Sequence, residues 1–486
     1  MKKLSLKTGL YFCILLIQFK VYCQDKRTEE IAKMMQYAEN NAYYNGAIAV
    51  VEKGKIIYSK GIGYSDIDTK TKNDENTLFN LCSISKQFTA MGIMMLNEED
   101  KLSYNDKLEK YFPELNYPGV TIRHMLNHTS GLPDYLLTLI QVWQDEQTPT
   151  NSDAIRVLAN SKLSAKFTPG EKYEYSNTGY MLLATILEKV GGKTYEQFLK
   201  ERIFNKLGMK RTAIYLRGIT PKIPENFARP YAYDAGLNKF VLTSDFEQYR
   251  RQVATLDGNY GDGGVYSSIA DMLSWDNELK NIRLVKKETL QEAFTSGKNN
   301  EGKEIGYGFG WFIMSDPLQG KIVQHTGGWP GYRQAFVRYL DKDRTLLVLR
   351  NTEINFSSIQ LAIQNILDEK PWTMPRPPLA HVLALHSNDA ASIRKAYEES
   401  KKDAPPAREE DVNITGYQMM QAGKLSQALE IMKINVELYP NSWNVYDSLG
   451  EVYLAIGDKE NAKINYKKSL ELNANNDEAK KALKKL

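Results

Sequence analysis

Short apolar runs separated by turn residues indicate strands in two parts of the chain. Ala47–Val51 and Lys55–Lys60 flank a turn containing Gly54, so residues 46–64 are predicted to form a β-hairpin. After residue 305, four more strand-like runs follow with short turns between them: Tyr307–Met314, Lys321–Gln324, Tyr332–Tyr339 and Thr345–Arg350. Because short turns join them, we expect these late strands to pair antiparallel.

Between the two strand regions, residues 77–200 are predicted to be mainly helical. Prolines and glycines mark the loops, and Asn177–Val190 is apolar at helical spacing. Gly191 is the expected C-terminal cap of that helix. An early hairpin, a helical middle and late strands predict a mixed α+β fold, in which an antiparallel sheet is flanked by helices and accompanied by a helical subdomain.

The composition changes near residue 370. We expect a linker and connecting helix over 371–408, with a helical segment at roughly 389–402, and repeats over 409–486. Three pairs of residues lie 34 apart in the repeats: Gly423 and Gly457, Ala428 and Ala462, Leu438 and Leu472. This spacing resembles tetratricopeptide repeats, over about two units and a closing helix. Two units are fewer than the three or so needed for stability, so we expect them to lean on the 379–402 segment or on the preceding domain.

The N-terminus has the features of a secretory signal peptide. Three lysines stand among its first seven residues, and Gly9–Phe19 is mostly apolar but well short of the roughly 20 residues that cross a bilayer. We predict a signal peptide over residues 1–23, with Gln24 first in a secreted or periplasmic chain that has no transmembrane helix. An uncleaved anchor and a lipid-modified Cys23 are the alternatives.

Composition narrows the class of protein. The 486 residues are 42% apolar and 25% charged, as in soluble globular proteins of two or three domains. Three cysteines exclude a disulfide scaffold. The formal net charge is +4, and the signal peptide holds four lysines and no acid, so the mature charge is 4 − 4 = 0. Nucleic acid is therefore not an expected partner.

The first candidate for chemistry is Ser83-x-x-Lys86. Residues three apart share one face of a helix, so the hydroxyl and the amine can meet. A serine needs a neighbouring base, and lysine can serve if its pKa is lowered from about 10.4. The pattern alone is weak, since Ser392 and Lys395 form a second copy. A helix-capping serine beside a solvated lysine is the structural alternative.

Two further elements follow in the sequence. Tyr175-Ser176-Asn177 comes after the turn Phe167–Glu171, and His325-Thr326-Gly327-Gly328 comes at the end of a short strand. The glycine pair would let a substrate backbone approach the strand edge. Tyr-x-Asn by itself is common, since Tyr43 and Tyr439 begin other copies.

Together and in this order, the three elements resemble the serine β-lactamase and penicillin-binding superfamily, in particular its class C-like branch of esterases and D-amino-acid peptidases. The stretches Thr121–Pro133 and Gly263–Ser268 also match. The resemblance covers about 30–365 and implies a serine hydrolase domain over residues 24–370.

The resemblance also implies roles. Ser83 would be the acylated nucleophile, Lys86 would take its proton, and Tyr175 would carry a proton to the leaving group. Backbone N–H groups of Ser83 and Gly328 would form the oxyanion hole, which stabilises the tetrahedral intermediate. No metal or organic cofactor is required.

Four more residues would bind substrate: Asn177, which would hold Lys86 or a substrate amide, and His325, Thr326 and Gly327. Class C β-lactamases have Lys-Thr-Gly where this chain has His-Thr-Gly. Histidine, with a pKa near 6.5, is mostly neutral at pH 7, whereas lysine is a fixed charge for a β-lactam carboxylate. The difference disfavours efficient β-lactamase activity and leaves esterase, amidase and D-amino-acid peptidase activity open.

Other chemistry-bearing residues have structural interpretations. His124 and His128 stand four apart, as zinc ligands can, but no third ligand has a telling spacing. Cys82 lacks a matched base and is expected to be buried. The glycine-rich run 258–264 does not fit a phosphate-binding motif and is expected to be a loop near the active site.

The sequence therefore predicts a serine hydrolase that acts through an acyl-enzyme on a small ester, amide or D-amino-acid peptide. The alternative is a catalytically silent, penicillin-binding-like protein that binds a peptide or protein partner through its repeats. Substrate choice depends on the cleft, built largely from residues 132–166 and 212–260, which carry no recognisable motif.

Overall fold

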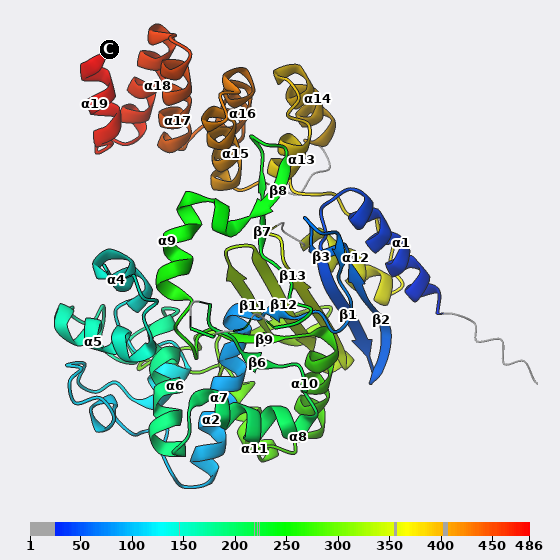
Figure 1. The fold of residues 1–486 in the computed structure, drawn as a ribbon, viewed down its shortest axis with the longest axis vertical. Helices are drawn as coiled ribbons and strands as arrows, with labels where there is room; N and C mark the ends of the chain where they lie inside the picture. Colours follow the sequence, from blue (N-terminus) through cyan, green and yellow to red (C-terminus); the bar gives the residue numbers. More distant parts are fainter. Residues whose placement is uncertain are drawn as a thin grey trace, which may run out of the picture.

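The computed structural model describes residues 25–144, 146–217, 219–220, 222, 224–353, 357–401 and 407–486 (Figure 1). The predicted signal peptide lies outside these residues. No helix within them is long and apolar enough to cross a membrane.

A six-stranded antiparallel sheet forms the centre of the main domain. Its strands lie in the order β10 (Phe312–Asp316), β11 (Gly320–Trp329), β12 (Tyr332–Tyr339), β13 (Arg344–Arg350), β1 (Gly46–Glu52) and β2 (Lys55–Ile62). The predicted hairpin is thus β1–β2, and β12 and β13 match their predicted bounds closely. In β1, Ala47 and Ala49 face one apolar cluster while Ile48 and Val50 face another, so the sheet is buried on both sides.

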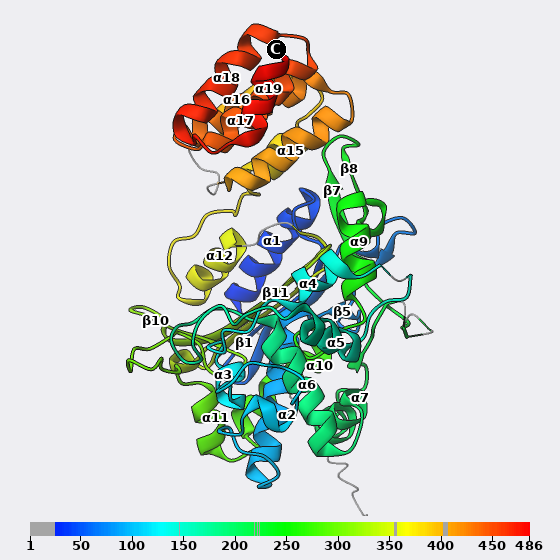
Figure 2. The ribbon, with the colours of Figure 1, turned by 90° about the vertical axis from the view of Figure 1, so that its left-hand side faces the viewer.

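Helices cover both faces of this sheet (Figure 2). One face carries α1 (Lys26–Asn40) and α12 (Ser357–Leu367). The other carries α2 (Lys86–Glu98) and α10 (Ile269–Asn281), with α6 (Asn177–Gly191) packed on α2. This arrangement confirms the predicted α+β fold.

The helical subdomain lies beside α2 and α6. Its other helices are α3 (Ile122–Leu126), α4 (Tyr135–Val142), α5 (Asn151–Ser161) and α7 (Tyr195–Leu199). The cap of α6 differs from the prediction by one residue, because Gly191 is still helical and Gly192, at φ +68°, has the left-handed conformation that ends the helix. Three more helices of the main domain are α8 (Asn205–Leu207), α9 (Glu247–Leu256) and α11 (Lys287–Ala293).

Three small sheets and several short helices complete the main domain. The sheets pair β5 (Phe79–Asn80) with β9 (Val265–Ser267) and β6 (Ala213–Ile214), β3 (Tyr64–Asp66) with β4 (Thr71–Lys72), and β7 (Tyr231–Asp234) with β8 (Lys239–Leu242). The short helices are η1 (Cys82–Ser85), η2 (Leu108–Lys110), η3 (Lys200–Phe204), η4 (Thr243–Asp245) and η5 (Leu340–Lys342).

The strand predicted for Tyr307–Met314 is wrong in its first half, because β10 begins only at Phe312. Gly308 lies so close to the backbone of Ala293 that a Cβ would sit 2.0 Å from its carbonyl oxygen, and Gly310 has φ +80°. The aromatic residues of this segment are buried in an irregular conformation that no strand could adopt.

Residues 379–486 form an all-helical region, here called the helical tail. Its helices are α13 (Leu379–Leu385), α14 (Ala390–Ser400), α15 (Glu409–Gln421), α16 (Leu425–Leu438), α17 (Trp443–Ala455), α18 (Lys459–Leu472) and α19 (Asp477–Lys485). Two helix pairs and a closing helix appear where the 34-residue period predicted them, with Gly423 and Gly457 at positive φ in the turns. Their assignment as tetratricopeptide repeats stays a prediction.

The helical tail is packed against the main domain (Figures 1 and 2). The hairpin β7–β8 reaches it, and Ala235 at the hairpin tip belongs to the apolar cluster of the tail. The backbone N–H of Ala235 donates to Gln418 Oε1 at 3.2 Å, and the rings of Tyr233 and His381 are 5.2 Å apart. The helices α15–α19 therefore lean on the main domain as well as on α13 and α14.

Candidate active site

A tight turn presents Ser83 at the start of α2. The Leu81 N–H donates to the Val265 carbonyl at 2.9 Å, which ties the turn to β9. The Cys82 N–H donates to Asn80 Oδ1 at 2.8 Å, and Cys82 has φ +51°. A non-glycine residue in this left-handed region is strained by about 1–2 kcal/mol, so the surrounding contacts must hold the turn in place. The backbone directly before Ser83 is therefore tightly fixed.

Lys86 occupies the first turn of α2, and its amine has three polar neighbours. Nζ lies 3.2 Å from Ser83 Oγ, 2.9 Å from Asn177 Oδ1 and 2.8 Å from the Asp262 carbonyl oxygen. The Asn177 and Asp262 oxygens can only accept hydrogen bonds. A neutral amine has two N–H groups for these two acceptors, and its lone pair then remains for the hydroxyl proton of Ser83.

The surroundings of Lys86 favour the neutral amine. The side chain is 0% exposed, and burial, opposed in part by the charge of Asp262, lowers its pKa to about 8. Among the described residues, no carboxylate forms an ion pair with it. A useful fraction of Lys86 is therefore unprotonated near neutral pH, as a general base requires.

The start of α6 supplies the next two residues. Ser176 caps the helix by accepting the Gly179 N–H, which places Asn177 in the first turn facing Lys86. The Tyr175 ring centre is 5.0 Å from Lys86 Nζ. Burial raises the pKa of Tyr175, and a hydrogen bond with Ser83 opposes this only in part, so the phenol keeps its proton at neutral pH.

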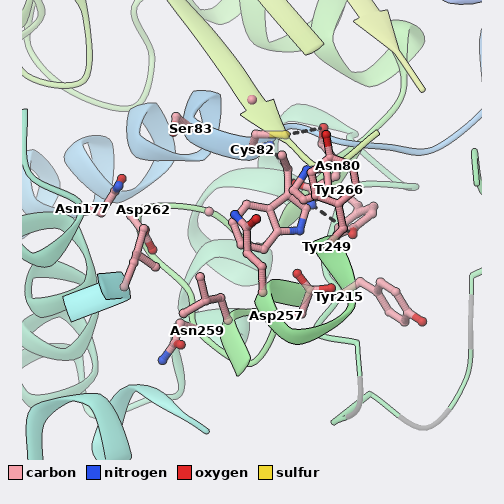
Figure 3. Close-up of a pocket in the computed structure, with 18 of the residues that line it drawn as sticks. Asn80, Cys82, Ser83, Asn177, Tyr215, Tyr249, Asp257, Asn259, Asp262 and Tyr266 are labelled. Atoms are coloured by element: carbon pink, nitrogen blue, oxygen red, sulfur yellow. Dashed lines mark hydrogen bonds between the residues drawn. The ribbon is translucent and has the colours of Figure 1, made fainter. Parts of the chain in front are cut away.

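A cavity of about 440 Å³, here called the catalytic cleft, opens over Ser83. Asn177 and Gly328 also line it, and the predicted loop 258–264 contributes Asn259, Asp262, Gly263 and Gly264. Figure 3 shows Ser83 and Asn177 at one end, with Asp257, Tyr215 and Tyr249 towards the other. The volume suits a small-molecule substrate.

The adjacent glycines Gly327 and Gly328 of β11 serve different purposes. A Cβ on Gly327 would lie 2.4 Å from the Leu81 carbonyl oxygen and 3.0 Å from Cys82 Cβ, so only glycine lets β11 approach the turn before Ser83. Gly328 is exposed and faces the cleft, where its N–H and that of Ser83 are candidate oxyanion donors. The sequence predicted that a substrate backbone would approach the glycine pair closely. At Gly327 the close approach is instead to the chain itself.

His325 is buried beneath the cleft and is only 1% exposed. Its Nδ1 lies 2.7 Å from the Thr326 carbonyl, which fixes the ring proton on Nδ1, and Nε2 then accepts from the Tyr307 hydroxyl at 2.9 Å. Burial, reinforced by the charge of Lys86, lowers its pKa to about 3. His325 is therefore neutral, as the sequence predicted, and both ring nitrogens are already engaged within the protein. Thr326 is exposed on the opposite face of β11.

A neutral His325 predicts that binding of a carboxylate ligand is independent of pH between about 5 and 7, since the ordinary histidine pKa of about 6.5 plays no part. The basic groups near His325 are Lys86 and His128, and burial lowers the pKa of His128 as well. The tyrosines against its ring, Tyr175 and Tyr307, keep their protons because burial raises their pKa values. Affinity of the Ser83→Ala protein for a carboxylate-bearing ligand, measured by calorimetry across this range, tests the point. Affinity that falls as pH rises would contradict it.

Sequence reasoning missed two residues that complete the site. Asp262 offers its backbone carbonyl to Lys86, while its buried carboxylate accepts from the Tyr135 hydroxyl at 3.2 Å. Burial raises the pKa of Asp262. The glycines around Asp262 were a signal for a loop near the site, but nothing in the sequence linked Tyr135 to it.

The remaining candidates have structural roles. Cys82 is buried and burial raises its thiol pKa, which disfavours a thiol nucleophile. His128 accepts the Ser176 N–H at 3.0 Å, and its ring centre lies 4.2 Å from that of Tyr175, so it supports the segment leading into α6. Within the described ranges, no three His, Cys, Asp or Glu side chains gather as a metal site.

Comparison with known proteins agrees with this geometry. Residues 31–368 match the Beta-lactamase family. Penicillin-binding protein 4* of Bacillus subtilis (strain 168) is 38% identical over 358 residues, which cover 73% of this chain and 79% of that one. A D-aminopeptidase of Cereibacter sphaeroides is 26% identical over 324 residues, covering 63% and 57%. The solved structure of an octameric penicillin-binding protein homologue from Pyrococcus abyssi superposes with a TM-score of 0.59 and 27% identity, covering 75% and 81%.

Fold and comparisons together define a protein of the serine-hydrolase class with a β-lactamase-like fold. The chain belongs to the Beta-lactamase family. The family matches end at residue 368, so they do not extend to the helical tail.

Proposed function

We propose that this protein is a hydrolase that forms an acyl-enzyme at Ser83. The observation that carries the proposal is the buried amine of Lys86, which lies 3.2 Å from Ser83 Oγ, has a pKa of about 8 and directs both N–H groups of its neutral form elsewhere. A solvated lysine beside a capping serine would have none of these features.

The proposed chemistry follows from the contacts. Lys86 Nζ takes the hydroxyl proton as Ser83 Oγ attacks the substrate carbonyl carbon, and the backbone N–H groups of Ser83 and Gly328 stabilise the oxyanion. When the bond to the leaving group breaks, that group receives a proton through Tyr175, which Lys86 reprotonates. Water then attacks the acyl-enzyme, giving up its proton to Lys86, and Lys86 returns that proton to Ser83 Oγ as the product acid leaves.

The substrate class proposed is a small ester or amide of the D-amino-acid type. The size of the catalytic cleft and the name of the D-aminopeptidase relative support it. The neutral His325 supports esterase or amidase activity over efficient β-lactamase activity, because it supplies no fixed charge for a β-lactam carboxylate. Export through the predicted signal peptide is part of the proposal and rests on sequence alone.

The direct test compares the full mature chain with its Ser83→Ala variant on a short-chain p-nitrophenyl ester and on a D-alanine p-nitroanilide. We expect turnover by the native protein and rates at the uncatalysed background for the variant. Mass spectrometry of the quenched native protein should show the acyl group on the peptide that contains Ser83. Equal rates for the two proteins would instead favour a silent binding protein.

The pKa of Lys86 predicts how activity depends on pH. The neutral amine is the active form, and its fraction grows as pH rises through about 8, so kcat/KM should increase about tenfold per pH unit below that pKa and then level off. Initial rates from about pH 6 to 9.5, each corrected with the Ser83→Ala protein at the same pH, measure the profile. A profile that is flat or falls over this range would exclude Lys86 as the base.

A further inference from the structure

A second cavity lies between the main domain and the helical tail. Its volume is about 610 Å³, larger than that of the catalytic cleft, and it is here called the distal groove. The outer face of β11 and β12 forms its floor, the segment from β7 to α9 forms one wall, and α13 and α15 of the tail form the wall opposite. Figure 2 shows α15 beside the tip of the hairpin β7–β8, with α12 between it and the strands β1 and β11.

The distal groove adjoins the catalytic cleft. Four residues line both: Tyr249, Gly328, Arg333 and Glu353. Arg333 and Glu353 form an ion pair at 3.5 Å, and the Tyr249 hydroxyl donates to Glu353 at 2.9 Å. Arg333 is about two-fifths exposed, so apart from Gly328 this boundary consists of side chains that can turn aside. A ligand longer than the cleft can therefore pass over Gly328 into the groove.

The strand between the two cavities has a free edge. β10 pairs with β11 only as far as Phe312 opposite Gln324, and no described strand pairs with His325–Trp329 on that side. An unpaired edge offers alternating N–H and C=O groups, which an extended peptide backbone can pair with. Thr326, Gly327 and Gly328 belong both to this edge and to the lining of the groove.

The walls of the distal groove suit an uncharged chain with small side chains. Alanines at positions 232, 335, 380 and 384 leave room, and amide or hydroxyl groups stand at Gln324, Thr415 and Gln418. The exposed charges in the lining are paired, Arg408 with Asp411 and Arg333 with Glu353. Arg350 also lines the groove, but it is buried. His381, also in the wall, has its pKa lowered to about 4 by burial and is neutral. A wall of hydrogen-bonding groups among small apolar side chains is better suited to a peptide backbone than to a charged polymer.

We propose that the distal groove is a substrate subsite for the extended part of an oligopeptide with small, uncharged side chains, and that the helical tail thereby determines substrate length. This inference rests on the proposed function, because the scissile bond of such a peptide would lie at Ser83. The tail then acts as part of the enzyme's own cleft.

The test uses the full mature chain and alanine peptides of two, four and six residues, each with one scissile bond after a D-alanine. One series is extended on the amino side of that bond and one on the carboxyl side. In one of the two series, kcat/KM should rise by about tenfold or more with length, as 1.4 kcal/mol of added binding energy would give. No gain in either series would overturn the proposal, while turnover of the short ester would leave the proposed function intact.

Ile414 offers a variant that blocks the groove without disturbing a core. It lies on α15 in the groove wall and is 49% exposed. Ile414→Arg should abolish the gain with peptide length and leave turnover of the short ester unchanged. The matched control is Ile464→Arg on α18, where isoleucine is 62% exposed and lies outside the groove, and it should keep the gain. A gain that persists in Ile414→Arg would show that the peptide does not enter the groove.

Binding without turnover separates the two proposals. Fluorescence anisotropy of a labelled six-residue peptide should show binding to the Ser83→Ala protein and loss of binding when Ile414→Arg is added. Such binding in a protein whose native form hydrolyses nothing would support the groove and reject the proposed function. Competition by maltohexaose as strong as by unlabelled peptide would overturn the peptide assignment in favour of a glycan chain.

Discussion

Replacing Lys86 by methionine is expected to lower kcat/KM for a short ester by about 10³-fold, the contribution typical of a well-placed general base. Methionine fills the space of the lysine stem, but its thioether sulfur is far too weak a base to take the Ser83 proton. It also leaves Asn177 Oδ1 and the Asp262 carbonyl without their donor, which costs about 1–3 kcal/mol of stability. Initial rates and thermal unfolding of the purified variant measure both effects.

The second Ser-x-x-Lys copy provides the control. Lys395 lies three residues after Ser392, as Lys86 does after Ser83, but its side chain is 77% exposed on α14. Lys395→Met should therefore leave both activity and melting temperature unchanged. Full activity in Lys86→Met would remove Lys86 from the chemistry, whereas equal losses in the two variants would point to a general effect of removing a lysine.

Gly327→Ala is expected to damage stability and activity together. The new Cβ would lie 2.4 Å from the Leu81 carbonyl oxygen, so β11 must move away from the turn that presents Ser83. Overpacking of this kind costs about 1–3 kcal/mol. A displacement of about 1 Å between Ser83 and the Gly328 N–H should lower kcat about 10²-fold, because the oxyanion donors would no longer meet the reacting carbonyl. Thermal unfolding and kcat for the short ester are the measurements.

Gly328 is the matched control for stability. A Cβ there would meet only the Arg333 side chain, at an ordinary contact distance of 3.5 Å. Gly328→Ala should therefore unfold at the temperature of the native protein. A melting temperature for Gly327→Ala that equals that of Gly328→Ala would show that β11 adjusts freely, and the close approach to Leu81 would then have no structural cost.

Regular local patterns predicted much of the fold. The hairpin β1–β2 and the strands β12 and β13 follow from apolar runs with short turns, and the tail helices follow from a 34-residue period. The strand prediction was wrong over residues 307–311, because an apolar aromatic run is typical both of a buried strand and of a buried irregular segment. Only the backbone of Ala293, distant in sequence, decides between them. The hairpin β7–β8 was missed because it has no motif, and its partner is the helical tail.

Part of the candidate site could likewise be predicted from the sequence, and part could not. Ser83, Lys86 and Asn177 were predicted from short motifs, and the structure brings Ser83 and Asn177 each within hydrogen-bond distance of Lys86. Asp262 contributes a backbone carbonyl, which any residue type could supply, so its identity carries no signal. The burial that lowers the pKa of Lys86 comes from residues spread over the whole main domain. That environment cannot be deduced from spacing along the chain.

The strand order also sets a folding order. β1 pairs with β13. Glu52 and Arg344, which lie opposite each other at the end of this strand pair, are 292 residues apart in the sequence. Closing so long a loop costs entropy before any sheet hydrogen bond compensates, so non-local pairing of this kind folds slowly. On the ribosome, the first hairpin must wait for residues 344–350 before its sheet can be completed. Every premature stop before β13 therefore yields a chain without the strand that joins β1–β2 to the rest of the sheet, and such a fragment exposes an open sheet edge that invites aggregation.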